Sequence, residues 1–509
     1  MKKTCVLIIL DGWGIGEENE SNPVYVVKPE TFVWLKENYP VTSLHASGIS
    51  VGLPWGETGN SEVGHLTLGA GKVLYQYYPR ISLAIRDGSF FANEILKQVF
   101  THARTNQSSV NLVGLLSKAN VHASIEHIQA LIRMGEQENI PVKLHLFADG
   151  KDSPPRTVEA FLKEIPKEKI ATLTGRYYAM DREERWTLTQ KTYETLLGKG
   201  GLMAPDPSPQ IQSIFAQGMT EEFLPPLRLR EDAGIKDGDA MLFFNFREDS
   251  IRQLAVSFIK KDFNAFPAQQ FQNLFIATMT EYESSFEVPV VFPSEHVEQP
   301  LGKVISDHGE TQLRLGESYK YAHITYFFNG HMEAPFKNEY RVLIPSLQSP
   351  HAEEHPEMQA RMITDRLVQA VESQGFDFIL VNYANPDTIA HTGNYNGALE
   401  AVRTIDRELG RFLKVAVDTN TPVIVTADHG NVEELFNPRT GTPETQHDPN
   451  PVPLYLVAPE YKGRKFRNTD NLREPIGSLA DIAPTILHLM NIPKPPEMTG
   501  NDLLEELMV

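Results

Sequence analysis

Residues 4–10 have the sequence TCVLIIL, a continuous apolar and β-branched run that ends abruptly at Asp11 and Gly12. Such a run predicts a strand buried on both faces, as in a parallel sheet covered by helices. Asp11 then lies at the carboxyl end of that strand. Taken alone, Asp-Gly after a strand is equally compatible with ordinary turn chemistry.

Two apolar runs near the other end of the chain have the same form, 376–381 (FDFILV) and 422–426 (PVIVT). Metal-ligand residue types follow them: Asp387 and His391 after the first run, Asp428 and His429 after the second, and His447 further on. The first pair is spaced i, i+4, which places both side chains on one face of a helical turn.

With Asp11, this gives three carboxylates and three imidazoles, most of them just past the ends of predicted strands. A single Asp or His in a loop is more often structural than a ligand. Six together, buried without a metal, would carry uncompensated charge. Mixed Asp/His shells suit divalent ions such as Mn²⁺ or Zn²⁺, and two metals about 4 Å apart stabilise the attacking and leaving oxygens of phosphoryl transfer.

Residues 58–71 have the sequence TGNSEVGHLTLGAG, in which Ser61 is surrounded by glycines that let backbone approach a ligand closely. One interpretation is a surface turn in which Ser61 caps the next helix. The predicted metal cluster favours the other, that Ser61 is a nucleophile whose alkoxide a metal stabilises.

The middle of the chain carries four more predicted strands, 110–116, 142–147, 170–173 and 240–246. Basic and acidic residues follow their ends: His122, then Lys151 and Asp152, then Arg176 and Arg182, then Arg247 at the start of an expected helix. In an open α/β sheet, ligands bind at the carboxyl ends of the strands. Solvated loop residues would explain any one of these positions, whereas their recurrence favours an anion pocket.

The candidate ligands fall at 11 and 61 and again from 387 to 447, so the segment between must leave one sheet and return to it. We therefore expect an α/β protein with two α/β domains: a discontinuous metal-binding domain (1–75 and 296–509) and an inserted substrate-binding domain (76–295). The stretches 75–80 and 293–300 are the expected linkers, 319–328 an expected strand, and 357–374 an expected helix.

Size and composition agree with this organisation. At 509 residues the chain is too long for one ordinary core. The net charge of −19 argues against nucleic acid or an anionic membrane as partner. The single cysteine, Cys5, excludes an intramolecular disulfide and a Cys-based zinc site, which fits a reducing compartment. Asp11 interrupts the N-terminal apolar run too early for a signal peptide or a membrane span, so we expect a soluble cytoplasmic protein.

The motifs taken together closely resemble the cofactor-independent phosphoglycerate mutases, a branch of the alkaline phosphatase superfamily. The resemblance spans nearly the full length and rests on segments in the right order: LDGWG at 10–14, GNSEVGH at 59–65, LGAG at 68–71, DGxDxPPR at 149–156, GRYYAMDR at 175–182, NFRxD at 245–249, KYxHxTxFFNG at 320–330, NxxNPDxxxHTG at 382–393, TADHGN at 426–431 and HxxNPVP at 447–453.

The resemblance implies an isomerase that interconverts 3-phosphoglycerate and 2-phosphoglycerate through a phosphoserine at Ser61, without 2,3-bisphosphoglycerate. It implies an alkaline-phosphatase-like metal domain with two Mn²⁺ ions, one held by Asp387, His391 and His447 and the other by Asp11, Ser61, Asp428 and His429. The implied substrate contacts are His122, Lys151, Asp152, Arg176, Arg182 and Arg247, with Lys320 contributed by the metal domain. Members of the family resemble monomers that close two domains around the substrate.

Two positions depart from the family pattern. Lys151 stands where an arginine is usual, and Ser250 replaces an arginine that usually follows NFRxD. Both affect the expected substrate contacts and neither affects the metal positions. Another phosphatase or phosphomutase of the superfamily, or a metal-binding regulator without catalysis, remain the alternatives; a regulator of that kind would be expected to have lost Ser61 or a ligand.

Overall fold

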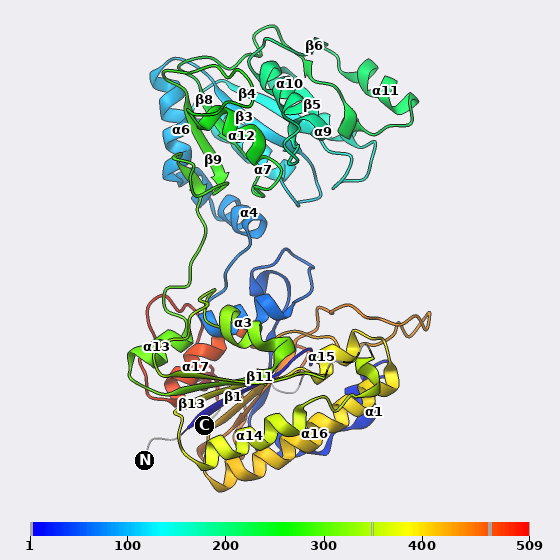
Figure 1. Cartoon of the computed structure of the whole chain (residues 1–509), viewed down its shortest axis with the longest axis vertical. Helices are drawn as coiled ribbons and strands as arrows, with labels where there is room; N and C mark the ends of the chain where they lie inside the picture. The colour runs from blue at the N-terminus through cyan, green and yellow to red at the C-terminus, as the bar shows by residue number, and fades with distance from the viewer. Residues whose placement is uncertain (1–3, 348, 350, 467–470, 508–509) are drawn as a thin grey trace. The chain divides into compact units, whose positions relative to one another are not determined.

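The computed structural model describes residues 4–347, 349, 351–466 and 471–507. The chain forms two compact units: unit 1 comprises Met1–Tyr75 and His296–Val509, and unit 2 comprises Gln76–Glu295. Within the described residues each unit contains one eight-stranded sheet with helices packed on it (Figure 1). The predicted fold class of two α/β domains is confirmed.

The sheet of unit 1 is built around β1 (Cys5–Leu10), whose six residues are all buried. Its neighbours are β13 (Phe378–Tyr383) and β14 (Val423–Thr426), both parallel to it. The other strands complete the order β12-β11-β13-β1-β14-β15-β2-β16 and are β2 (Val41–His45), β11 (Gln312–Glu317), β12 (Glu339–Ile344), β15 (Val452–Val457) and β16 (Gly477–Ser478). The continuous apolar run of the sequence is thus the central strand, buried on both faces as parallel strands are.

Helices cover both faces of this sheet (Figure 1). They are α1 (Pro23–Val27), α2 (Glu30–Asn38), α3 (Ser61–Ala70), α13 (Leu301–Asp307), α14 (Ala360–Glu372), α15 (Asn385–Ala390), α16 (Tyr395–Asp418) and α17 (Ile482–Leu489). Helix α16 shows why: its buried residues include Ala398, Ala401, Ile405, Leu409 and Phe412, a spacing of three and four that forms one apolar stripe. Helix α14 confirms the helix predicted over 357–374.

Unit 2 repeats the principle with the strand order β10-β9-β8-β3-β4-β5-β7-β6. The strands are β3 (Val110–Leu116), β4 (Val142–Ala148), β5 (Ile170–Gly175), β6 (Leu202–Met203), β7 (Leu227–Arg228), β8 (Ala240–Phe243), β9 (Phe275–Thr280) and β10 (Val290–Phe292). The helices are α4 (Tyr77–Asp87), α5 (Ser89–Ala92), α6 (Glu94–Thr105), α7 (Ile125–Gln137), α8 (Val158–Leu162), α9 (Arg176–Ala179), α10 (Trp186–Leu196), α11 (Ser208–Ala216) and α12 (Arg252–Ile259). The four strands predicted in this region are β3, β4, β5 and β8, which lie side by side and parallel.

Three local predictions were wrong. The expected strand 319–328 is a 3₁₀ turn (Ser318–Lys320) followed by a π-helical turn (His323–Phe327). The expected linker 75–80 already contains the first turn of α4, where Pro79 is tolerated because first-turn amides have no helical partner. The helix expected from Arg247 begins only at Arg252.

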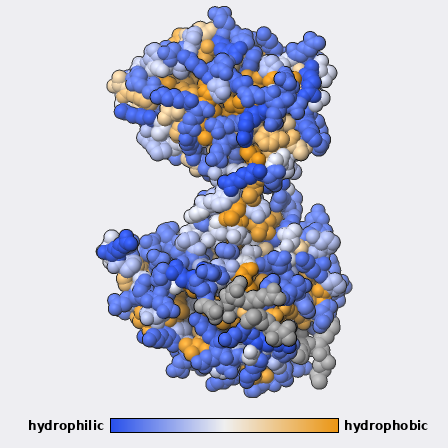
Figure 2. Space-filling model, turned by 180° about the vertical axis from the view of Figure 1, so that it is seen from behind, coloured by the Kyte–Doolittle hydropathy of each residue, from blue (hydrophilic) through white to orange (hydrophobic). Residues whose placement is uncertain are grey.

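The surface is mostly polar. Hydrophilic residues cover most of the face seen in Figure 2. Among the helices of the described residues, none combines the length and the apolar content needed to cross a membrane.

Candidate active site

The candidate metal ligands of unit 1 gather because adjacent parallel strands end at the same edge of the sheet. Asp11 directly follows β1, and Asp428 and His429 follow β14. Asp387 lies in the first turn of α15, which begins two residues after β13.

One group consists of Asp387, His391 and His447. The Nε2 atoms of the two imidazoles are 3.1 Å apart, and they lie 3.2 Å and 3.3 Å from Oδ1 of Asp387. The i, i+4 pair predicted from the sequence therefore does share one face of a helical turn. The three candidate ligand atoms form a triangle small enough to surround one ion.

A second group consists of Asp11, Ser61, Asp428 and His429. The Nε2 atom of His429 lies 2.9 Å from Ser61 Oγ, 3.5 Å from Asp11 Oδ1 and 3.6 Å from Asp428 Oδ2. Ser61 Oγ also donates to Asp11 Oδ1 at 3.1 Å. The two groups adjoin, since the rings of His429 and His447 stack with centroids 3.9 Å apart. The sets Asp387–His429–His447 and Asp11–Asp428–His429 both have the spacing of metal ligands.

The tautomers of the imidazoles fit a cation. Nδ1 of His391 lies 2.9 Å from the carbonyl of Thr445, and Nδ1 of His447 lies 2.8 Å from the carbonyl of Gly59. A carbonyl only accepts, so Nδ1 carries the hydrogen and each neutral ring turns the lone pair of Nε2 towards the other ring and towards Asp387. Facing lone pairs beside a carboxylate repel unless a cation or a proton lies between them, and this Nδ1 bonding is the usual support of a metal-bound histidine.

Electrostatics point the same way. Burial lowers the pKa of His429, but the carboxylates of Asp428, Asp11 and Asp387 outweigh it and raise that pKa to about 10. Burial raises the pKa of Asp387, but Lys320, His391 and His447 outweigh it and hold that pKa well below its ordinary range. The site thus retains ionised carboxylates and attracts positive charge.

Lys320, which the family resemblance implies as a substrate contact, lies among these ligand groups. Its Nζ donates to Asp11 Oδ1 at 2.7 Å, to Ser61 Oγ at 2.8 Å and to Asp387 Oδ2 at 2.8 Å. Burial lowers its pKa, but Asp11, Asp387 and Asp428 outweigh it and keep the pKa above its ordinary value. Lys320 is therefore a charged donor directed at the hydroxyl of Ser61.

Ser61 is the first residue of α3 and not its cap. The capping side chain is Asn60, whose Oδ1 accepts from the amide of Val63 at 2.9 Å. The hydroxyl of Ser61 therefore faces the ligand groups, at the positive end of the helix dipole.

Three further residues contact the candidate ligands. They belong to the sequence motifs, but the sequence alone offered no reason to assign them a role. Asn382 Nδ2 donates to Asp11 Oδ2 at 2.8 Å, and Asn431 Nδ2 donates to Asp387 Oδ1 at 2.9 Å. His65 Nδ1 lies 3.1 Å from Asp428 Oδ2. All three are fully buried, so they fix the orientation of the carboxylates. Their presence in the motifs was the only signal in the sequence, because their partners lie between 44 and 371 residues away.

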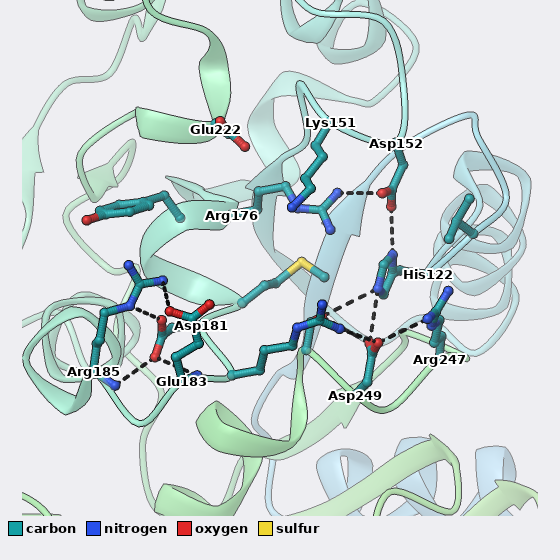
Figure 3. Close-up of a pocket in the computed structure, with 15 residues that line it drawn as sticks. His122, Lys151, Asp152, Arg176, Asp181, Glu183, Arg185, Glu222, Arg247 and Asp249 are labelled. Atoms are coloured by element: carbon teal, nitrogen blue, oxygen red, sulfur yellow. Dashed lines mark hydrogen bonds and ion pairs between the residues drawn. The ribbon is translucent and has the colours of Figure 1, made fainter.

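Unit 2 contains a cavity of about 280 Å³ at the carboxyl ends of its strands. All six residues predicted to bind substrate in this unit line it: His122, Lys151, Asp152, Arg176, Arg182 and Arg247. Figure 3 shows His122 between two carboxylates, with Asp152 Oδ2 at 2.6 Å from Nδ1 and Asp249 Oδ1 at 3.1 Å from Nε2. The cavity wall therefore alternates basic and acidic side chains.

Five lining residues with charge were missed from the sequence: Asp181, Glu183, Arg185, Glu222 and Asp249. Asp249 pairs with Arg182 and Arg247, and Arg185 pairs with Asp181. The motif NFRxD already contained Asp249, but a carboxylate in an anion pocket gave no reason to select it.

The two departures from the family pattern both lie at this cavity. Lys151 lines it, and Ser250 is buried in its wall. Arg252 pairs with Glu248 and is not among the lining residues, so it does not replace the missing arginine in this arrangement.

Comparison with known proteins places the chain. A family model described as the metalloenzyme superfamily matches residues 3–494. A 2,3-bisphosphoglycerate-independent phosphoglycerate mutase of Synechococcus sp. (strain JA-2-3B'a(2-13)) is 43% identical over 98% of this chain and 95% of its own length. The chain belongs to this family of mutases.

Further mutases and one solved structure support the same family and fold. The enzyme named 2,3-bisphosphoglycerate-independent phosphoglycerate mutase 1 of Methanosarcina barkeri is 41% identical over 99% of this chain and 98% of its own length. The counterpart of Moorella thermoacetica is 40% identical over 99% of both chains. A crystal structure of Leishmania mexicana phosphoglycerate mutase, 24% identical, covers 100% of this chain and 98% of its own with a TM-score of 0.53, which supports the fold.

Proposed function

We propose that this chain interconverts 3-phosphoglycerate and 2-phosphoglycerate through a phosphoserine at Ser61, with two bound Mn²⁺ ions and without 2,3-bisphosphoglycerate. Membership of the mutase family supports the reaction. One observation supports the mechanism: the hydroxyl of Ser61 is contacted at once by Lys320, His429 and Asp11, at the meeting point of two carboxylate–imidazole groups.

In the proposed reaction, Ser61 gives up its proton to solvent by way of Asp11 Oδ1, to which its hydroxyl donates, and Ser61 Oγ attacks the phosphorus of the substrate. The bond from phosphorus to the glycerate oxygen breaks, and that oxygen takes up a proton, so that glycerate stays bound as the diol. Its other hydroxyl then loses its proton and attacks the phosphoserine, the bond from phosphorus to Ser61 Oγ breaks, and Ser61 is protonated again. The charged Nζ of Lys320 stabilises the negative charge on that oxygen in both steps.

The metals fit the residues present. One would be held by Asp387, His391 and His447, and the other by Asp11, Ser61, Asp428 and His429. When bound, divalent ions supply Lewis-acid stabilisation of phosphoryl oxygens and favour the serine alkoxide. Nitrogen and oxygen donors without sulfur agree with Mn²⁺ as the ion.

Unit 2 is proposed to bind the glycerate part of the substrate. Its cavity collects six basic residues, which suits a carboxylate or phosphate on a protein whose net charge is −19. We further propose that the protein acts as a monomer in the cytoplasm, as the family resemblance implies; light scattering of the purified chain measures the first point.

The deciding experiment is an assay that couples 2-phosphoglycerate formation to enolase, without added 2,3-bisphosphoglycerate, and records inorganic phosphate in parallel. Mutase activity should require Mn²⁺ and disappear with EDTA. Release of phosphate without isomerisation would instead identify a phosphatase. Dependence on 2,3-bisphosphoglycerate would refute the phosphoserine route.

A further inference from the structure

Asp249 lies among the basic residues of the unit 2 cavity and holds three of them at once. Its Oδ2 accepts from Arg182 NH1 at 2.9 Å and lies 3.2 Å from Arg247 NH2. Its Oδ1 lies 3.1 Å from His122 Nε2 (Figure 3). One carboxylate thus contacts all three basic side chains of this part of the cavity.

Two other arginines of the cavity, Arg176 and Arg185, are held by buried carboxylates. Arg176 is buried and held by Asp149 at 2.7 Å and by Asp152 at 2.9 Å, and the Asp149 side chain is 2% exposed. Arg185 is held by the fully buried carboxylate of Asp181. These pairs are parts of the wall, since breaking them would strand buried charge.

The two arginine pairs of Asp249 are open to water, whereas its third partner, His122, has a side chain that is only 6% exposed. The side chains of Arg182 and Arg247 are 60% and 51% exposed, and that of Asp249 is 24% exposed. Asp249 also precedes α12, which begins at Arg252, so no helix fixes its backbone. Exposed ion pairs contribute little free energy, so another anion can replace Asp249 beside the two arginines at small cost, provided that it also takes the place of Asp249 beside His122.

Asp249 carries the chemical group that a substrate would bring. Its side chain ends in a carboxylate, as glycerate does, and a phosphate offers three oxygens of similar basicity to the same donors. We propose that Asp249 is an internal counter-ion that occupies an anion subsite formed by His122, Arg182 and Arg247, and that an anionic group of phosphoglycerate displaces it on binding. This inference rests on the proposed function for the identity of that anion.

Ser250 supports the counter-ion. Its buried hydroxyl donates to Asp249 Oδ1 at 3.0 Å, which orients the carboxylate towards its basic partners. The family pattern has an arginine at this position, which would add a cation to the subsite. In this chain the residue at that position, Ser250, instead donates a hydrogen bond to Asp249 and holds its carboxylate in the subsite. Substrate must therefore displace that carboxylate.

The test compares Asp249→Asn with Glu222→Gln in the full chain. Both remove one carboxylate of the same cavity, but no ion pair of the described residues joins Glu222 to the three basic residues of the subsite. Titration calorimetry with glycerate, inorganic phosphate and 3-phosphoglycerate measures anion affinity. Asp249→Asn should bind 3-phosphoglycerate, and at least one of the two simpler anions, about five- to tenfold more tightly than wild type, because the exposed pairs that compete with the anion are lost. Glu222→Gln should change the affinity for these anions less than twofold, because it removes only a charge that solvent and salt screen.

A gain of affinity cannot come from structural damage, which only weakens binding. Whichever of glycerate and phosphate tightens identifies the group that takes the place of Asp249. Weaker binding by Asp249→Asn would overturn the proposal and make Asp249 a residue that orients the arginines. Equal changes in the two variants would overturn it as well, since the effect would then be general charge.

Ser250→Ala provides a second route if Asp249→Asn does not fold. Loss of the hydroxyl should loosen Asp249 and tighten anion binding about twofold, and unchanged or weaker binding there counts against the proposal. The enolase-coupled assay on wild type separates this question from the proposed function. If wild type showed no mutase activity but Asp249→Asn bound phosphate more tightly, the role of Asp249 as a counter-ion would stand and the proposed reaction would be refuted.

Discussion

Two buried histidines of unit 2 should make that unit sensitive to acid. His145 on β4 lies between Asn111 Oδ1, 3.1 Å from Nε2, and Thr172 Oγ1, 3.0 Å from Nδ1. Burial lowers its pKa from 6.5 to about 3, helped by the charge of Lys143. Burial likewise lowers the pKa of His127, which bonds Ser82 through Nε2, to about 3.

The sign and size of the effect follow from these values. Because the folded pKa lies below the unfolded one, the stability contribution is complete above about pH 6.5 and is lost as pH falls towards 3. At pH 5 the histidine is protonated in the unfolded state but still neutral in the folded state. The unfolded state is therefore stabilised by about 2 kcal/mol per histidine, which is 1.36 kcal/mol for each pH unit between about 6.5 and 5. The two histidines together should lower the free energy of unfolding of unit 2 by roughly 4 kcal/mol between pH 7 and pH 5.

His145→Gln tests this, because glutamine keeps a hydrogen-bonding side chain and does not titrate. Hydrogen exchange of the β3 and β4 amides in the full chain, corrected for intrinsic rates at each pH, reports the stability of unit 2 alone. The substitution itself can lower the free energy of unfolding of unit 2 at pH 7. The further decrease in that free energy between pH 7 and pH 5 should be about 2 kcal/mol smaller in the variant than in wild type. Equal losses in the two proteins would refute the assignment of acid sensitivity to His145.

Three other outcomes are expected. Ser61→Ala should bind Mn²⁺ in calorimetry yet show less than about a hundredth of wild-type mutase activity, as for a deleted nucleophile, and higher activity would exclude the phosphoserine route. Gly64→Ala would bring its Cβ within 2.5 Å of the carbonyl oxygen of Asp428 and should weaken Mn²⁺ binding at least about tenfold, a cost typical of overpacking, whereas Gly375→Ala, whose nearest contact is 3.4 Å away, should not. Burial raises the pKa of the Cys5 thiol to about 12, so native protein should resist a thiol reagent at pH 8 and react only after unfolding; rapid native labelling would contradict that burial.

The sequence predicted the parts of the fold that depend on short-range pattern. The apolar runs became β1, β3, β4, β13 and β14 with ends within about two residues, because strands buried on both faces consist mostly of apolar side chains. Polar residues after those ends could be placed together for the same reason, since parallel neighbours end at one edge.

The remaining errors arose where tertiary contacts decide local structure. The segment after β11 alternates in sequence, yet its buried residues Ile324, Thr325 and Phe328 have helical spacing. Helix α12 starts late because the amide of Phe246 donates to the carbonyl of His122 at 2.8 Å, which ties the chain to the loop after β3. No pattern within either segment records such a partner.

The same limit applied to the site. Residue types identified the ligand candidates, but the roles of Asn382, His65 and Asp249 depend on partners as far as 371 residues away. Contacts between residues so far apart in the sequence are visible only in the folded chain, which shows which side chain orients another.

The place of β1 at the centre of its sheet has a consequence for biosynthesis. Cys5 pairs with Phe378, and Val6 with Val423, so this strand leaves the ribosome long before either neighbour exists. At about 5–20 residues per second, the delay is on the order of 20–80 s. Unit 2 is contiguous from Gln76 to Glu295 and has no such delay. The nascent chain therefore carries a wholly apolar N-terminal segment past a domain that can already be folded, which makes that segment the part of the chain most in need of a chaperone during translation.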